Sequence, residues 1–253
     1  MTAKEPLLLL HGVTMSANVW CGVAGLMTEF DLIIPTAPGH RGGPRRDGPV
    51  SISKLVDHAE RLLDGKGLQS IHIAGNSLGG WVAIELARRG RARSVCAFSP
   101  AGFWTDGTQD KAVPTGKIRH AMRVARRAEP IVPLLFGAAW MRRFATREVA
   151  QHGDRLSRMQ AVAIVQDMIE CDAADDLLNT AESVAPLHDL PCPITLAWAD
   201  EDRIFPPGIH GSTARSRIPG GRYVALRDVG HVPMIDDPGL CAATIRAAVE
   251  TSV

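Results

Sequence analysis

The sequence carries no excess of charge of either sign, and this excludes two classes of protein. Its 253 residues include 28 Lys or Arg and 27 Asp or Glu, which gives a formal net charge of +1 at pH 7. A strongly basic nucleic-acid surface or an acidic solvating tail needs a much larger imbalance. From the balanced charge we expect no nucleic-acid partner. Because 45% of the residues are hydrophobic and 22% are charged, the composition is that of a folded globular protein.

Paired cysteines and long apolar runs are also missing. The chain has five cysteines, which are Cys21, Cys96, Cys171, Cys192 and Cys241. Their odd number and wide spacing, with no C-x-x-C pair, indicate neither a disulfide framework nor a zinc ribbon. The uncharged window at residues 130–141 carries two prolines and a glycine and is far shorter than the roughly 20 residues that span a bilayer. The apolar run at residues 7–10 is too short for a signal peptide, so we expect a soluble, cytoplasmic protein without a membrane span.

The sequence also lacks the common motifs of nucleotide and metal chemistry. No G-x-G-x-x-G follows a strand-like run, and no G-x-x-x-x-G-K-[ST], H-E-x-x-H or calcium-binding loop is present. We therefore expect a reaction on a small-molecule substrate that needs no cofactor and no metal.

Short apolar runs alternate with helical patterns through the first hundred residues. The strand-like runs are residues 7–10, 32–34, 71–74 and 94–99, and the helical patterns between them are residues 19–27, 52–63 and 78–89. The alternation resumes near the C-terminus with strand-like runs at 194–198 and 222–226 and helical patterns at 208–217 and 238–250. Such alternation is typical of an α/β fold with a parallel sheet that is covered by helices on both faces.

Residues 104–187 interrupt the alternation with several helical patterns and no strand-like run. We predict a helical insertion over 104–187 in a single core formed by residues 1–103 and 188–253. Residues 111–147 hold nine Lys or Arg, opposed only by Glu129, whereas residues 167–182 hold six acids and no base. We favour two solvated helix faces that neutralise each other over an anion-binding pocket.

A nucleophile motif lies at the end of the strand-like run 71–74. Residues 75–79 read G-N-S-L-G, the G-x-S-x-G pattern, and a helical pattern follows directly. A serine in such a tight turn has strained backbone angles and an exposed hydroxyl, and Gly75 and Gly79 allow the strand and helix to cross closely. The helix that begins at Leu78 also directs free backbone N–H groups towards any negative charge beside Ser77. Ser77 is therefore the predicted nucleophile.

A serine nucleophile needs a base and an acid that orients the base. His231 is the best base, because it lies in a loop after the last predicted strand, at the same carboxyl edge of the sheet as Ser77. Asp202, in the loop after the preceding strand, is the favoured acid. Asp200 in the same loop is the weaker alternative, and Asp106 is the fallback.

These residues resemble the α/β-hydrolase superfamily across the whole chain. Ser77, Asp202 and His231 occur in the family's order of nucleophile, acid and base, each in the loop after a strand. Residues 35–44 resemble the family's P-G-h-G turn, with Arg41 in place of the second glycine. The resemblance implies a mostly parallel sheet flanked by helices, with residues 104–187 as a helical cap.

The resemblance also implies an oxyanion hole. His11-Gly12 is similar to the family's oxyanion-loop signature, so the backbone N–H groups of Val13 and Leu78 would bind the oxyanion. Trp104 and Trp140 lie in the cap, and we expect them to contact the substrate.

Two features of the chain depart from the family pattern. Only ten residues precede His11, so we predict about six parallel strands with the family's first hairpin absent. A bare first strand would then leave an exposed edge, which favours a homodimer. The loop at residues 13–16 is not glycine-rich, which weakens the similarity to C–C bond hydrolases of ring-cleavage products. A serine nucleophile disfavours the family's haloalkane dehalogenases and epoxide hydrolases, in which an aspartate attacks.

The sequence therefore predicts a serine hydrolase that cleaves a carboxylic ester or related acyl bond through an acyl-enzyme intermediate. Two alternatives stay open. The same three residues could break a C–C bond in a ring-cleavage-type diketone, or the chain could be a ligand-binding receptor on a hydrolase scaffold with an inert Ser77.

Overall fold

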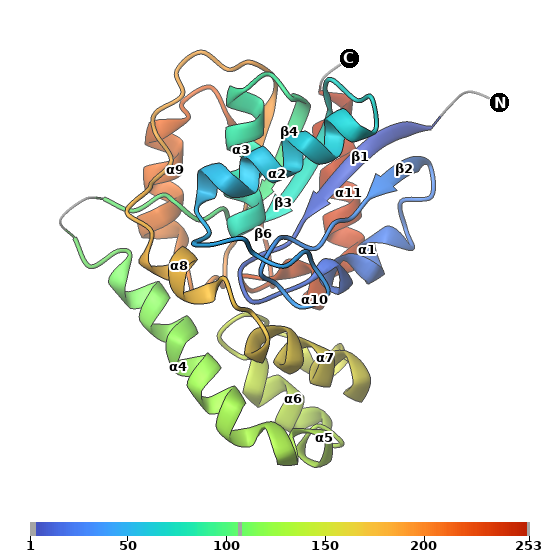
Figure 1. The fold of residues 1–253 in the computed structure, drawn as a ribbon, viewed down its shortest axis with the longest axis vertical. Helices are drawn as coiled ribbons and strands as arrows, with labels where there is room; N and C mark the ends of the chain where they lie inside the picture. Colours follow the sequence, from blue (N-terminus) through green and yellow to red (C-terminus); the bar gives the residue numbers. More distant parts are fainter. Residues whose placement is uncertain (1–3, 106–107, 252–253) are drawn as a thin grey trace.

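The computed structural model describes residues 4–105 and 108–251, and within them six strands form one parallel sheet (Figure 1). The strands are β1 (Glu5–Leu10), β2 (Phe30–Ile33), β3 (Ile71–Asn76), β4 (Ala92–Phe98), β5 (Ile194–Ala199) and β6 (Arg222–Leu226). Their order is β2-β1-β3-β4-β5-β6, and each neighbouring pair is parallel. The predicted α/β fold with about six parallel strands is confirmed.

The prediction of a bare first strand is wrong. β1 lies between β2 and β3, and Leu7 is in register with Leu32 on one side and His72 on the other. Both backbone edges of β1 are therefore paired, and β2 and β6 form the edges of the sheet. The sequence places the strands along the chain, but strand order depends on distant pairings that a run of apolar residues does not encode.

Helices cover both faces of the sheet. The elements outside the β4–β5 connection are η1 (Ala17–Trp20), α1 (Cys21–Ala24), α2 (Ile52–Gly65), α3 (Leu78–Arg88), η4 (Pro207–Gly211), α9 (Ser212–Arg217), α10 (Pro233–Asp236) and α11 (Pro238–Glu250). Leu8 packs in the cluster that includes α2 and α3, whereas Leu7 and Leu9 pack in the cluster that includes α1 and α11. Successive side chains of a strand point to opposite faces, so the continuous apolar run of β1 supplies both cores.

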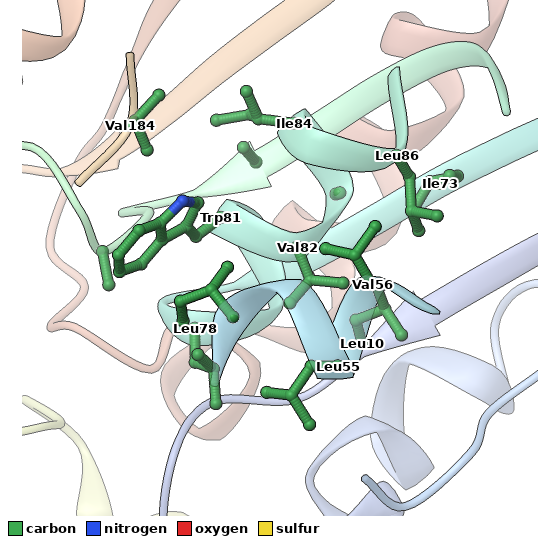
Figure 2. Close-up of a cluster of buried hydrophobic side chains, with 14 of the residues drawn as sticks. Leu10, Leu55, Val56, Ile73, Leu78, Trp81, Val82, Ile84, Leu86 and Val184 are labelled. Carbon is green, nitrogen blue, oxygen red and sulfur yellow. The ribbon is translucent and has the colours of Figure 1, made fainter. Parts of the chain in front are cut away.

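The helix α2, which the sequence predicts from its cap and its apolar spacing, packs against α3. The Ser51 side chain accepts a hydrogen bond from the Lys54 backbone N–H and caps α2. In Figure 2, Leu55 and Val56 of α2 lie close to Val82 of α3, and all three side chains are buried. Because α3 is held between α2 and the sheet, its N-terminus is fixed at the end of β3.

The connection from β4 to β5 carries the predicted insertion. It contains α4 (Ala112–Ala128), η2 (Glu129–Ile131), α5 (Val132–Leu135), α6 (Ala139–Thr146), η3 (Gly153–Arg155), α7 (Arg158–Ile169) and α8 (Ala174–Asn179). Figure 1 shows α4, α5, α6 and α7 gathered at one end of the molecule, below the sheet in this view.

The acidic stretch of this insertion pairs mainly with the rest of the chain. Asp167 and Asp176 form ion pairs with Arg41 and Arg46, which precede the insertion, at 2.9 and 2.6 Å. Among the ion pairs of the described residues, only the pair between Arg119 and Asp175 joins the basic stretch 111–147 to the acidic stretch 167–182. The acidic stretch therefore holds the insertion against the core more than it neutralises the basic stretch.

Candidate active site

Ser77 occupies a strained turn between β3 and α3. Its backbone has φ 54° and ψ −115°, in the left-handed region that a non-glycine residue rarely adopts. A Cβ atom added at Gly75 would lie 2.2 Å from the Gly79 carbonyl oxygen, and one added at Gly79 would lie 2.2 Å from the Leu10 carbonyl oxygen. Both positions therefore need glycine, and their close crossing holds Ser77 in its turn.

The loop after β1 passes directly beside Ser77. A Cβ atom added at Gly12 would lie 3.3 Å from the Ser77 Cβ. Val13, Ser77 and Leu78 line one small cavity of about 40 Å³. The structure thus brings the two predicted oxyanion residues, Val13 and Leu78, next to Ser77, and Leu78 begins α3, where backbone N–H groups have no helical partner.

His11 fixes this loop as a neutral side chain. Its Nδ1 donates to the Gly12 carbonyl oxygen at 2.8 Å, and its Nε2 accepts from the Ala37 backbone N–H at 2.9 Å. Burial, together with the charge of nearby His40, lowers the pKa of His11 to about 3. The ring therefore stays uncharged near neutral pH and keeps both hydrogen bonds.

His231 and Asp202 form a buried hydrogen-bonded pair. His231 Nδ1 lies 2.8 Å from Asp202 Oδ2, and neither residue is more than 4% exposed. The other carboxylate oxygen, Oδ1, accepts from the backbone N–H groups of Ile204 and Phe205 at 2.9 and 2.7 Å. Asp200, the alternative in the same loop, is exposed. The fallback acid, Asp106, lies outside the described residues.

Ser77 and His231 line the same pocket, which we call the Ser77 pocket. It has a volume of about 50 Å³, and its other lining residues include Gly12, Val13 and Met15. Among the hydrogen bonds of the described residues, none joins the Ser77 hydroxyl to the His231 ring. Such bonds are often long without substrate and tighten when it binds.

Charged side chains from the insertion complete the Ser77 pocket. Lys117 of α4 and Glu148, which follows α6, both line it, and their charged groups lie 3.1 Å apart. Lys117 Nζ also donates to the Arg203 carbonyl oxygen at 2.6 Å, beside Asp202. The insertion is therefore tied to the loop that carries the predicted acid.

Two positioning residues were missed by the sequence reasoning. Asn76 Nδ2 donates to the His231 carbonyl oxygen at 2.8 Å, across 155 positions of the chain. The buried carboxylate of Asp236 accepts from the backbone N–H groups of Gly230 and His152, both at 2.7 Å. No local sequence pattern marks either residue, because the tertiary fold brings each of them to its backbone partners.

The two tryptophans predicted to contact substrate lie in different places. Trp104 is 7% exposed, lines the small cavity beside Ser77 and Leu78, and packs edge-on against Trp81 with ring centroids 5.4 Å apart. Trp140, on α6, is 67% exposed and lines neither cavity that contains Ser77. The structure therefore brings Trp104, but not Trp140, together with the nucleophile.

Residues 4–105 and 108–251 contain no cluster of three or more His, Cys, Asp or Glu side chains placed to hold a metal ion. None of the helices in these two ranges is long and apolar enough to cross a membrane.

A model of the alpha/beta hydrolase family matches residues 7–244. The chain belongs to this family. It is 35% identical to the epoxide hydrolase EphH of Mycobacterium tuberculosis, over 79% of this chain and 96% of that protein. It is 29% identical to the pimeloyl-[acyl-carrier protein] methyl ester esterase of Aromatoleum aromaticum, over 97% of this chain and 98% of the esterase.

Solved structures agree at the level of the fold. A thermophilic esterase from Thermogutta terrifontis superposes with a TM-score of 0.73 at 22% identity, covering 99% of this chain and 91% of the esterase. The epoxide hydrolase CorEH superposes with a TM-score of 0.77 at 16% identity, covering 98% of this chain and 92% of that chain. These alpha/beta hydrolase relatives support a hydrolase of the superfamily, and they differ among themselves in the bond that they cleave.

Proposed function

We propose that the chain is a serine hydrolase that cleaves a carboxylic ester or a related acyl bond through an acyl-enzyme intermediate. The observation that carries the proposal is the buried pair of His231 and Asp202, whose Nδ1 and Oδ2 atoms lie 2.8 Å apart, with His231 lining the same pocket as Ser77. A hydroxyl on a strained turn beside an oriented imidazole is the arrangement that activates a serine.

The mechanism follows from the hydrogen bonds. Because His231 Nδ1–H donates to Asp202, its Nε2 is free to take the proton of the Ser77 hydroxyl. The Ser77 oxygen then forms a bond to the substrate carbonyl carbon, and the carbonyl oxygen becomes an oxyanion that the backbone N–H groups of Val13 and Leu78 stabilise. The proton on Nε2 passes to the departing alkoxide, which leaves as an alcohol. Water, deprotonated by the same nitrogen, then releases the acid and restores Ser77.

We further propose that residues 104–187 act as a cap on a core of residues 1–103 and 188–253. Support comes from Lys117, Ile118 and Glu148, which line the Ser77 pocket together with residues of the core loops. A cap at this place would exclude water and define the shape of the substrate pocket.

Epoxide hydrolysis is the second candidate, and the 35% identity to EphH favours it. The chemistry of Ser77 opposes it. A carboxylate that opens an epoxide forms an ester, which water can hydrolyse. A serine that opens an epoxide forms an ether, which the same His–Asp pair cannot cleave.

The test is a substrate panel on the purified protein and its Ser77→Ala variant. The panel holds p-nitrophenyl acetate, styrene oxide and a ring-cleavage diketone. We expect turnover of the ester, with kcat lowered by about 10⁴ or more in Ser77→Ala. The control is Ser53→Ala, since Ser53 is an exposed serine on α2. Unchanged ester turnover in Ser77→Ala, or turnover of the epoxide or diketone but not the ester, would contradict the proposal.

A further inference from the structure

The Ser77 pocket is too small for most ester substrates. Its volume is about 50 Å³, and the neighbouring cavity beside Trp104 adds about 40 Å³. Pockets that enclose a small-molecule ligand commonly measure about 300 to 1,000 Å³. An acetyl group fits the space beside Ser77, whereas a longer acyl chain needs room elsewhere.

A much larger pocket lies on the other side of Met15. We call it the α7 pocket; its volume is about 460 Å³, and Met15 lines both it and the Ser77 pocket. The apolar side chains that line it include Val19, Leu156, Ile164, Met234 and Ile235. It therefore forms between the loop after β1, α7 of the insertion, and α10 just beyond His231.

The two carboxylates that line the α7 pocket are already occupied. Asp167 accepts hydrogen bonds from the Ser16 hydroxyl and from Arg41, at 2.5 and 2.9 Å. Asp236 accepts from backbone N–H groups, and Arg155 donates to the Asp236 carbonyl oxygen at 2.5 Å. Asn18 and Gln160 also line the pocket, but most of its exposed lining is apolar, so the pocket suits a hydrocarbon chain better than a charged group.

Met15 is the side chain between the two pockets. It is 4% exposed, and an unbranched thioether side chain changes rotamer more easily than a branched one. It is the residue that the linings of the two pockets share, so its rotation would change the boundary between them. The backbone N–H of Val13 is proposed to hold the substrate carbonyl oxygen. Val13 lies two residues before Met15, so the acyl side of the substrate would lie near Met15.

We propose that the α7 pocket binds the acyl chain of the substrate and that Met15 controls entry to it from Ser77. The inference rests on the proposed function and makes it more specific: the preferred substrates are esters of unbranched, medium-length fatty acids. Acetate esters react without using the α7 pocket.

The test compares kcat/KM for p-nitrophenyl acetate and p-nitrophenyl octanoate in two variants. Ala163 lines the α7 pocket and does not line the Ser77 pocket. Ala163→Phe is therefore expected to lower kcat/KM for octanoate about tenfold or more and to leave that for acetate within about twofold. Met15→Ala is expected to raise the ratio of octanoate to acetate turnover.

Ala145→Phe is the matched control, because Ala145 is exposed on α6 and lines neither pocket. If Met15→Ala fails to fold, Ala163→Phe decides alone. An equal effect of Ala163→Phe on both esters, or no effect on either, would overturn the inference while leaving the proposed function intact. Absence of any ester turnover in the unmodified protein would instead remove the proposed function.

Discussion

Asn76 holds the backbone of the loop that carries His231. Its side chain donates to the His231 carbonyl oxygen at 2.8 Å and to the Phe98 carbonyl oxygen at 3.2 Å. Both acceptors are buried, so the contacts link the turn at Ser77 directly to the predicted base. A displacement of that base by a fraction of an ångström would weaken proton transfer.

We therefore predict that Asn76→Ala lowers kcat for p-nitrophenyl acetate about tenfold. The free energy of unfolding should fall by about 1 to 2 kcal/mol, because the buried carbonyl of His231 loses the Asn76 donor and that of Phe98 loses one donor while it keeps the Ser77 backbone N–H. Steady-state kinetics and urea denaturation measure the two effects. The control, Asn179→Ala, changes an exposed amide of α8 that accepts a hydrogen bond from Arg119. Unchanged kcat in Asn76→Ala would show that the contact does not position His231.

The lowered pKa of His11 makes the stability of the fold depend on pH. Burial lowers its pKa to about 3 in the folded protein, whereas the ordinary value is 6.5. Between these values the unfolded chain binds a proton that the folded protein excludes. The free energy of unfolding therefore rises with pH in this window and falls on acidification, by at most about 1.4 kcal/mol per pH unit for this one site.

Urea denaturation of the protein and of His11→Asn at several values between pH 7 and pH 4 measures this slope. Burial also lowers the pKa of His40, so the slope of the unmodified protein includes more than one site. The difference between the two proteins isolates His11, and we expect a shallower slope in the variant. Equal slopes would show that His11 is protonated in the folded protein at mildly acidic pH.

The sequence was most informative about residues whose function depends on local context. The turn at Ser77 could be predicted because its glycines and flanking elements are adjacent in the chain, and the location of Asp202 and His231 at the same sheet edge because each follows a strand-like run. Asn76 and Asp236 were missed, since their importance comes only from partners brought near by folding. Trp140 was expected to contact the substrate but is exposed and lies away from Ser77. Its position in the insertion does not determine which way its side chain faces.

At the scale of elements, α7 is joined to the core through a buried carboxylate. The Asp167 side chain is 3% exposed and contacts both Arg41 and Ser16, the residue that caps η1. Arg41 stands where the family's turn usually has a second glycine. In this chain Arg41 therefore gives the insertion an ion-pair partner in the core.

We predict that Asp167→Ala lowers the free energy of unfolding by about 1 to 3 kcal/mol, because Arg41 and the Ser16 hydroxyl lose a charged acceptor. Asp175→Ala is the matched comparison, since Asp175 also pairs with an arginine but has an 80% exposed side chain. Its loss should cost no more than about 1 kcal/mol. Chemical denaturation of both variants gives the comparison, and equal losses would contradict a special role for the buried pair.

Element boundaries were predictable where capping and periodicity agree. The helix expected at residues 52–63 is α2 (Ile52–Gly65), with Ser51 as its cap. In the insertion, only the presence of several helices was predicted. Its α5 and α6 are short, and the apolar side chains of Leu134 and Trp140 are exposed, so apolar positions in the sequence do not identify the residues that pack or the bounds of these helices.

At the scale of the whole molecule, the parallel sheet brings three distant loops to one edge. The loops after β3, β5 and β6 carry Ser77, Asp202 and His231, and the loop after β1 passes beside them. Side chains delivered to the carboxyl edge of parallel strands meet whatever their separation in the sequence. The position of β1 inside the sheet, which the sequence did not predict, places the predicted oxyanion loop next to Ser77.

The most direct test of the account is covalent labelling by a fluorophosphonate probe, which reacts only with an activated serine. Intact-protein and peptide mass spectrometry would locate the adduct. The account predicts one adduct on Ser77, no adduct in Ser77→Ala, and much slower labelling in His231→Ala. An unlabelled native protein, or labelling that persists in Ser77→Ala, would contradict the claim that this site contains a catalytic serine.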